Sequence, residues 1–463
     1  MNNAQTENAT MTPKPISGGY LAADIHKASG GAYIVTAAQN NTDLHAEFFD
    51  ALVEYAGHIG AELIVCPILY NKNGWLQPED KTDLWFDPRV RPYLLDDRVY
   101  LSDDVLLLGN AHVLPTAKRP LTGFADAGNQ GDWLIIPASK IALECQAALK
   151  GETGKTLLST GTVTQKNYIA RKAGMVAELT HNFGAVIVEP FKKPRSIEWR
   201  DGEFFDFNGS DIYASKCTGA WVAQDMALIF GDIHAEKCAP ERMAAMIGLA
   251  EKIKPSLIVT HDTLDMESRN HHNKKDPFFL FKQDNDGRSV KSDIALARRV
   301  LRRFAAIAPV HVVLSNHDRA LDRWLSESDW RHDMVNASQY LKLALAKIRA
   351  IKAGLPFDCF AEACGKIDRV AFGTADQSRI FNGVELGHHG DKAANGARGS
   401  VAGFAKLGVP MVIGHSHTPA ICGAVYQVGV GGDLDMGYNE GASSWRHAHC
   451  AVYPNGQCQI IFE

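Results

Sequence analysis

The sequence predicts an α/β protein with two domains, a smaller one at the N-terminus and a larger one at the C-terminus. Short apolar runs of strand length alternate with amphipathic stretches of helix length, and several of the apolar runs end directly at Asp, Asn or His. The chain has 463 residues, of which 46% are hydrophobic and 22% are charged, as expected for two globular domains. We expect a disordered tail over 1–20, an N-terminal domain over 21–200 and a C-terminal domain over 201–463.

The N-terminal domain begins with a strand, a helix and a second strand. Residues 32–36 and 61–67 are apolar and of strand length, and 43–59 between them has the period of an amphipathic helix. This order predicts a right-handed unit with two parallel strands. Further strands are expected at 105–108, 133–137, 155–159 and 185–189, and a helix at 167–180. The sequence shows no repeat of fixed period, and no motif indicates a role for this domain.

A polar, turn-rich segment at 190–220 is expected to connect the two domains. Beyond it, strands are expected at 226–230, 256–260, 309–314, 384–387 and 410–414, and helices at 240–253, 289–307 and 336–353. Asn336 stands where its side chain can cap the last of these helices. The chain should close with a β-hairpin, 448–453 and 457–462, because Asn455-Gly456 favours a tight turn.

Composition bounds the class of protein. Nine cysteines are scattered without a Cys-x-x-Cys pair, so neither a zinc ribbon nor a dithiol redox site is indicated. A net charge of −5 does not by itself indicate a nucleic-acid-binding protein. The N-terminus lacks the layout of a secretory signal, and no apolar run reaches the roughly 18 residues that a membrane span needs. We therefore expect a cytoplasmic protein without a membrane span.

Five polar signatures in the second half of the chain carry the best indication of function. Each follows an expected strand, and loops outside the carboxyl ends of strands are where open α/β sheets gather their ligands. The signatures are Gly231-Asp232-Ile233-His234, His261-Asp262, Ser315-Asn316-His317-Asp318, His389-Gly390 and Gly414-His415-Ser416-His417.

The residue types of these signatures suit a centre of two divalent cations. Asp, Asn and His supply oxygen and nitrogen donors, and no cysteine stands among them, which argues against a structural zinc site. Asp232 and His234, like His415 and His417, are two residues apart, so both members of each pair can reach inward from an extended loop. Any one of these residues alone would more often be a turn former or an ordinary surface or core residue. The set together favours metal binding.

Over 225–445 the pattern resembles the calcineurin-like metallophosphoesterases, a superfamily of protein phosphatases, cyclic-nucleotide phosphodiesterases and repair nucleases. The resemblance implies an α/β sandwich for the C-terminal domain. The second signature begins with His261 and the third with Ser315, where the superfamily usually has Gly. Both residues lie beside candidate ligands and are not ligands themselves, so the departures concern loop geometry more than metal binding.

The resemblance also implies a role for each residue of the signatures. One cation would be held by Asp232, His234 and His417, the other by Asn316, His389 and His415, with Asp262 bridging the two. The family's His-Gly pair selects His389 over His388. A water activated by both cations would attack phosphorus in line, His317 would protonate the leaving oxygen, and Asp318 would orient that imidazole. The remaining histidines of this region are not assigned as ligands: His261, His271, His272, His388, His447 and His449.

Two polar loops beside the expected ligands are candidate contacts for a phosphate-containing substrate. One follows Asp262 and is rich in polar and basic residues, and the other follows His389 and contains glycines whose backbone N–H groups could cradle a phosphate. An ordinary flexible surface loop explains the second almost equally well. The candidate substrate residues are Arg269, Asn270, His271, Lys274 and Arg398.

These loops, together with 438–445, are similar to one subgroup of the superfamily, the early-expressed DNA-degrading and DNA-transfer proteins of T5-type bacteriophages. That narrower resemblance implies a DNA nuclease of the bacterial cytoplasm that uses two divalent cations, with Mn²⁺ favoured and Fe, Zn or Mg as alternatives. Two other functions stay open, a phosphoesterase of small molecules or nucleotides and a metal-bound DNA-handling scaffold without activity. DNA is the expected partner, and a homo-oligomer formed through or with the N-terminal domain is also expected.

Overall fold

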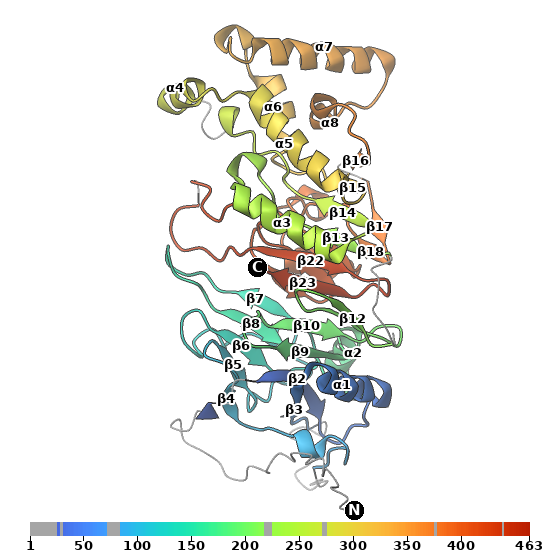
Figure 1. Cartoon of the computed structure of the whole chain (residues 1–463). Coiled ribbons are helices and arrows are strands. Elements are labelled where there is room, and N and C mark those ends of the chain that lie inside the picture. Colours follow the sequence, from blue (N-terminus) through green and yellow to red (C-terminus); the bar gives the residue numbers. More distant parts are fainter. Residues whose placement is uncertain are drawn as a thin grey trace, which may run out of the picture. The chain divides into compact units, whose positions relative to one another are not determined.

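The structure is a computed structural model that describes residues 26–27, 31–71, 84–216, 225–270, 276–374, 377–437 and 439–463. The α/β class predicted from the sequence is confirmed, since strands and helices alternate along the chain (Figure 1). The chain divides into two compact units. The first comprises Met1–Gly128, Asp132–Ile141 and Leu157–Ser196, and the second comprises Asn129–Gly131, Ala142–Thr156 and Ile197–Glu463. The last change from the first unit to the second lies between Ser196 and Ile197, and two earlier segments, Asn129–Gly131 and Ala142–Thr156, also belong to the second unit.

The first unit contains a sheet built on the predicted strand–helix–strand motif. Strand β2 (Ala32–Gln39) pairs in parallel with β3 (Ala61–Ile68) and antiparallel with β9 (Gly184–Val188). Helix α1 (Ala46–Ile59) connects β2 to β3 and ends at Gly60, whose left-handed backbone closes the helix. Its buried residues include Phe48, Leu52 and Tyr55, so one face of the helix packs on the unit's core.

Five further strands of this unit are hydrogen-bonded neighbours in the order β1-β4-β5-β6-β8. They are β1 (His26–Lys27), β4 (Arg98–Tyr100), β5 (Val105–Leu108), β6 (Trp133–Ile136) and β8 (Thr156–Ser159). The unit also contains the turn η2 (Arg91–Tyr93) and helix α2 (Lys172–Leu179), which begins five residues later than the expected helix at 167. Strand β10 (Arg195–Glu198) follows β9 and leads into the second unit.

The second unit is built on a six-stranded mixed sheet with the order β16-β15-β14-β13-β22-β23. Strands β13, β14, β15 and β16 are parallel, so their carboxyl ends share one edge, and β22 and β23 are antiparallel neighbours. The bounds are β13 (Ala227–Ile229), β14 (Leu257–Thr260), β15 (Val310–Val312), β16 (Val370–Phe372), β22 (Ala448–Val452) and β23 (Cys458–Phe462).

Six further strands of this unit are hydrogen-bonded neighbours in the order β7-β20-β21-β19-β18-β17. They are β7 (Leu143–Cys145), β20 (Ala420–Cys422), β21 (Val425–Gln427), β19 (Met411–Ile413), β18 (Val384–Glu385) and β17 (Ile380–Phe381). Strand β18 runs parallel to β19, and β19 runs parallel to β21. The carboxyl ends of β18 and β19 therefore also lie at one edge, and the loops that follow them carry His389, His415 and His417.

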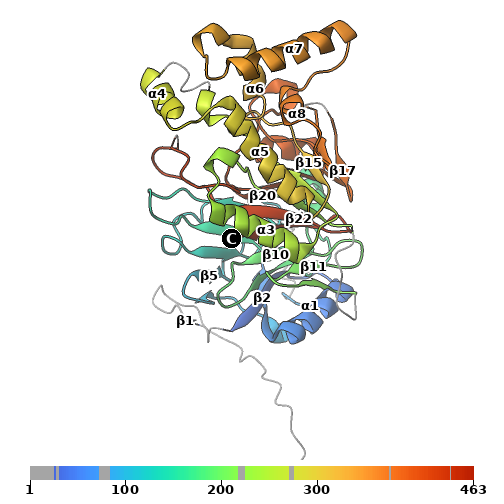
Figure 2. The same ribbon diagram turned by 45° about the horizontal axis from the view of Figure 1, so that its top comes forward.

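The helices of the second unit form two groups. Helices α3 (Pro240–Ile253) and α5 (Val290–Ala305) pack against each other beside the first sheet, and the others gather at one end of the unit (Figures 1 and 2). The second group comprises α4 (Pro277–Asn285), α6 (Ala320–Glu327), α7 (Ala337–Ala353) and α8 (Cys359–Cys364). Shorter elements are η3 (Ala235–Lys237), η4 (Glu267–Arg269), η5 (Trp330–His332), η6 (Ala394–Gly396), α9 (Val401–Phe404) and η7 (Ala405–Leu407).

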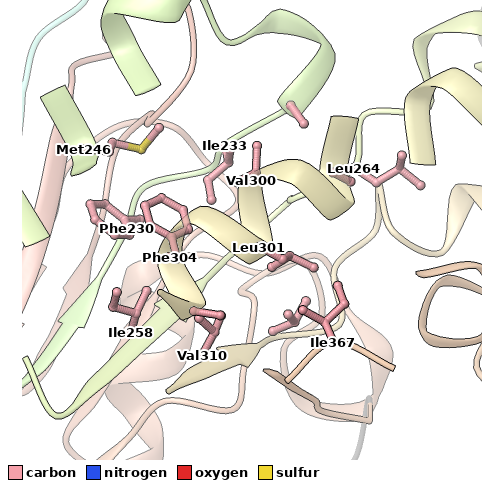
Figure 3. Close-up of a cluster of buried hydrophobic side chains, with 14 of the residues drawn as sticks. Phe230, Ile233, Met246, Ile258, Leu264, Val300, Leu301, Phe304, Val310 and Ile367 are labelled. Atoms are coloured by element: carbon pink, nitrogen blue, oxygen red, sulfur yellow. The ribbon is translucent and has the colours of Figure 1, made fainter. Parts of the chain in front are cut away.

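The core of the second unit fixes the strands that carry the candidate ligands. Phe230, directly after β13, stacks on Phe304 of α5 with ring centroids 4.7 Å apart. Met246 of α3 and Ile258 of β14 belong to the same buried cluster (Figure 3). The loops that leave these strands therefore start from rigid, close-packed positions.

Two expectations about this unit are wrong in detail. The segment at 190–220 is not a polar connection throughout, because β11 (Phe205–Phe207) and β12 (Ile212–Ala214) form an ordered hairpin. Phe205 is buried and stacks on Tyr453, with centroids 5.1 Å apart. Asn336 precedes α7, but its side chain does not cap that helix. It accepts a hydrogen bond from the Val290 N–H at the start of α5, because the two helices begin close together.

Candidate metal centre

The predicted ligands converge because their strands end at shared edges. Asp232 and His234 follow β13, Asp262 follows β14 and Asn316 follows β15, so all four leave the same edge of the first sheet. His389 follows β18, and His415 and His417 follow β19. Backbone hydrogen bonds join these loops, for example from the Gly414 N–H to the His389 carbonyl at 2.7 Å.

One group of four side chains is buried and compact. Ligand atoms of Asp232, His234, Asp262 and His417 all lie within 4.8 Å of one another. His417 Nε2 is 3.0 Å from Asp232 Oδ2 and 3.1 Å from His234 Nε2. His234 Nε2 is 3.7 Å from Asp262 Oδ2. This group could hold a metal ion.

A second group of donors lies on the other side of Asp262. The Asn316 side-chain oxygen is 3.0 Å from both His389 Nε2 and His415 Nδ1. His389 Nε2 is also 3.3 Å from Asp262 Oδ2. Asp262 therefore contacts both groups, in the place where a bridging carboxylate would lie. The structure brings His389 into this group and leaves His388 outside it, half-buried.

The donors present fit divalent cations. Asp232 Oδ1 and Asp262 Oδ2 are buried and have no well-aligned hydrogen-bond partner among the residues that the structure describes. Buried carboxylate oxygens without partners are costly, and a cation would satisfy both. The two Nε2 atoms of His234 and His417 face each other at 3.1 Å, and one cation could accept a lone pair from each. Carboxylate, amide and imidazole donors suit Mn²⁺, Fe or Zn.

Four of the seven candidate ligands have a left-handed backbone. The φ angles are 47° at His234, 43° at Asp262, 75° at His415 and 61° at His417. Each such residue costs on the order of 1 kcal/mol or more, and persists only where the surrounding structure imposes it. Other described residues away from the pocket also have positive φ, but more than half of the candidate ligands do, as is common where side chains must be aimed at a functional site.

Gly414 allows Asp232 to reach the pocket. A Cβ atom at position 414 would lie 2.4 Å from Asp232 Oδ1 and 3.1 Å from His261 Cγ. The same carboxylate accepts the His415 N–H at 2.8 Å through its other oxygen. The glycine in the fifth signature therefore has a steric cause, which is the close approach of the first signature.

His317 contacts Asp265 rather than Asp318. The His317 Nδ1 atom is 3.0 Å from Asp265 Oδ1, which also lies 2.9 Å from His234 Nδ1. Burial opposes a charged imidazole, but the negative charges of Asp262 and Asp265 outweigh it and raise the pKa of His317 to about 10. Burial likewise opposes ionisation of Asp265, whose pKa is nevertheless lowered by hydrogen bonds from the two histidines.

Asp318 holds two loops together instead of orienting His317 as expected. Its carboxylate accepts hydrogen bonds from the Leu264 N–H at 3.0 Å and from the Ser315 hydroxyl at 2.8 Å. Burial first, and then the charge of Asp262, raise the pKa of Asp318 to about 7. Asp318 thus fixes the loop after β14 to the loop after β15, on which Asn316 lies.

Comparison with known proteins gives one relative. No protein-family profile and no solved structure matches the chain. Protein A1 of Escherichia phage T5 is 40% identical over 459 residues, which cover 93% of this chain and 82% of the phage protein. The chain belongs to the Protein A1 family. The match places the protein among those of bacteriophages, in agreement with the phage subgroup that the loops of the sequence indicated.

Sequence reasoning missed two residues of the pocket in this Protein A1 relative. Asp265 lies three residues after Asp262 on the same loop, and that spacing was the available signal. His261 is fully buried, with Nδ1 3.4 Å from His389 Nδ1, and it forms a possible ligand group with Asp232 and His389. His449 also has a defined place, because its Nδ1 accepts the Gly231 N–H while its Nε2 lies 3.0 Å from Glu463.

The candidate substrate residues of this A1 family member are not all placed at the pocket. Arg269 is 8% exposed, and its guanidinium is hydrogen-bonded to Asp284 and Asp333, so it ties η4 to the neighbouring helices. Asn270 is buried. Arg398 is exposed and bridges to Lys392 across the loop that follows His389. His271 and Lys274 lie outside the described residues.

Proposed function

We propose that this protein is a phosphodiesterase that depends on two divalent cations and degrades DNA. One observation carries the proposal. Seven side chains from five separate segments, each after a strand, meet at one buried pocket with Asp262 between two donor groups. This arrangement matches what the metallophosphoesterase resemblance implies for two cations. Two cations bound there would supply a water of lowered pKa and neutralise the charge of a phosphoryl group.

The residues of the chain have separate tasks in this proposal. His317 is 18% exposed through its side chain, so it can meet a substrate from the edge of the pocket and give a proton to the leaving oxygen. Asp265 holds that imidazole from behind. The exposed pair Lys392 and Arg398 lies on the loop after His389, where a phosphate backbone could be bound.

DNA is favoured as the substrate for two reasons. The relative is a phage protein, and the loops of the chain resemble the DNA-degrading phage subgroup. In addition, the Trp445 ring lies edge-on to the His417 ring, with centroids 4.2 Å apart. An aromatic ring beside the pocket can stack with a nucleic-acid base. The expected place of action is the cytoplasm of the bacterial host.

The test is hydrolysis of linear and circular DNA by the purified chain with Mn²⁺, Mg²⁺, Zn²⁺ or EDTA. We expect Mn²⁺-dependent degradation that EDTA and Asp262→Asn both abolish. His389→Ala should lose at least a hundredfold in rate, while the matched control His388→Ala should keep the rate of the wild type. Hydrolysis of bis(p-nitrophenyl) phosphate without hydrolysis of DNA would point to a small-molecule phosphoesterase. Bound Mn²⁺ without hydrolysis of either substrate would point to a scaffold.

We further propose that the protein forms a homo-oligomer in which α7 of one copy packs in parallel on α7 of another. Only Ala337 and Leu343 are buried among its 17 residues, and Leu341, Leu345 and Ile348 are 46–49% exposed. Their spacing of four and three residues is that of a coiled-coil seam. Lys342 and Arg349 flank the seam on one side, and Ala344 and Ile351 flank it on the other. A parallel pair sets each cation beside an apolar residue, whereas an antiparallel pair would set cation against cation.

A further inference from the structure

The first sheet of each unit has the same strand plan. In the N-terminal unit, β2 pairs in parallel with β3 and antiparallel with β9. In the C-terminal unit, β13 pairs in parallel with β14 and antiparallel with β22. The parallel strands are connected by α1 in the first unit and by α3 in the second, and each of these helices has 14 residues.

The remaining strands of the two units correspond as well. The order β4-β5-β6-β8 in the N-terminal unit matches β17-β18-β19-β21 in the C-terminal unit. Strand β4 is antiparallel to β5, and β5 is parallel to β6. In the same way, β17 is antiparallel to β18, and β18 is parallel to β19. The strands also follow one another in the same order along the chain.

Individual backbone contacts fix the correspondence residue by residue. A parallel bridge joins Thr162 to Phe183 in one unit and Val430 to His447 in the other. The Thr160 N–H donates to the Ile136 carbonyl at 3.2 Å, and the Val428 N–H donates to the Ile413 carbonyl at 2.9 Å. The second parallel strand of each unit, β3 or β14, also accepts a hydrogen bond from the segment beside it. The Leu95 N–H donates to the Val65 carbonyl and the Val313 N–H donates to the Thr260 carbonyl, both at 3.0 Å.

From these contacts we infer that the N-terminal unit is a second copy of the C-terminal sandwich, whose metal ligands have been replaced and which binds no divalent cation. The strand registers set Ala38 against Asp232, Asn40 against His234, Pro67 against Asp262, Asn110 against His389, Ala138 against His415 and Lys140 against His417. The part concerning cations rests on the proposed function.

The replacements remove most of the donors and all of the negative charge. Ala and Pro offer no side-chain ligand, and Lys140 carries a positive charge that repels a cation. The buried Lys140 amine donates to the Ala117 carbonyl at 2.5 Å. The Asn40 amide oxygen accepts the Tyr70 N–H at 2.6 Å. These polar groups bond to the protein itself, whereas Asp232 and Asp262 in the other copy each keep a buried oxygen without a partner among the described residues.

The test is a count of Mn²⁺ in the full chain by mass spectrometry after saturation and removal of free metal, with the ions located by anomalous diffraction. We expect about two ions per chain, all at the C-terminal pocket. Paired substitutions at equivalent positions sharpen the comparison. His389→Ala should lose at least one ion and nearly all hydrolysis, and Asn110→Ala, at an exposed position, should change neither. His417→Ala and Lys140→Ala form a second pair of equivalent positions, for which the same difference in bound ions is expected.

The outcomes separate this inference from the proposed function. An ion located in the N-terminal unit, or an ion lost on Asn110→Ala, would overturn the inference. Should the wild type bind ions at the C-terminal pocket and hydrolyse nothing, only the proposed activity fails. If the wild type binds no ion at all, the proposed metal centre is contradicted. The inference that the N-terminal unit is a copy without metal ligands is not affected by that result.

Discussion

Asp265 is the residue whose role the structure defines most clearly beyond the predicted ligands. One carboxylate oxygen contacts Nδ1 of both His317 and His234, at 3.0 and 2.9 Å. A carboxylate behind a ligating histidine fixes the tautomer of the ring and raises its basicity. Asp265 therefore positions two side chains with different tasks, a candidate metal ligand and the candidate proton donor.

Asp265→Asn should lower the turnover of DNA about tenfold to a hundredfold, because outer partners of metal-site histidines typically contribute that much. The loss should be smaller with bis(p-nitrophenyl) phosphate, since p-nitrophenolate leaves without protonation and does not need His317. The measurement is kcat with both substrates together with bound Mn²⁺.

His317→Ala is the reference for this comparison. It should retain Mn²⁺ and lose most of the turnover of DNA. Equal losses of the two substrates in Asp265→Asn would show that Asp265 acts only through His234 and the metal. An unchanged rate in His317→Ala would contradict the proton-donor role.

Residue identity was predictable where a residue belongs to a short motif after a strand. Asp232, Asp262 and Asn316 are of this kind, and the structure brings them together with the four histidines. The carboxylate partner of His317 was not predictable, because the sequence offers two. Asp318 follows His317 directly, and Asp265 lies three residues after Asp262. Only the direction in which each loop turns decides which carboxylate faces the ring.

Helix α7 is the element whose surface is least explained by the fold of a single chain. It is attached to α6 by the Tyr340 hydroxyl, which donates to the Leu325 carbonyl at 3.0 Å, and by Lys347, 3.3 Å from Asp322. The seam formed by Leu341, Leu345 and Ile348 faces away from these contacts and is half-exposed. Burying the exposed half of each side chain would contribute about 1 kcal/mol.

Leu345→Glu combined with Ile348→Glu should shift the protein to a smaller species in light scattering after size-exclusion chromatography. The thermal midpoint at low concentration should change little, since neither side chain is fully buried in the single chain. Gln339→Glu, on the same helix but off the seam, is the control and should leave the mass unchanged. An unaltered oligomer in the double variant would move the interface elsewhere, for example to the N-terminal unit as the sequence suggested.

At the scale of the whole molecule, the pocket links stability to pH and to cations. Burial lowers the pKa of His389, but the charge of Asp262 outweighs it and raises that pKa to about 9, and the pKa of His317 is raised to about 10. Both values lie above the ordinary 6.5. Protonation of these two groups therefore stabilises the metal-free fold fully below pH 6.5, and this stabilisation is lost as the pH rises toward 9 and 10.

The gap between the thermal midpoints with Mn²⁺ and with EDTA should accordingly widen from pH 6.5 to pH 8.5. The metal-free chain loses the stabilisation from its protonated histidines, and cations bind better when those protons are absent. Differential scanning fluorimetry at pH 6.5, 7.5 and 8.5 measures the gap. The control is Asp262→Asn, in which the gap should be small at every pH. A gap in the wild type that stays constant or narrows would show that these protons do not compete with cations.

The described residues also bear on the expected absence of a membrane span. None of the described helices is both long and apolar enough to cross a bilayer.

The sequence by itself determined the α/β class and the strands that lead to the pocket, because a strand followed by Asp, Asn or His is a local pattern of a few residues. The resemblance to the metallophosphoesterases then selected the seven candidate ligands among the residues that follow those strands. The sequence did not reveal that the N-terminal unit repeats the plan of the C-terminal one. Strand order and register depend on backbone hydrogen bonds between distant segments, and such bonds tolerate almost any side chain. Ala38 and Asp232 therefore carry no common signal, and only the tertiary structure shows that they occupy the same place.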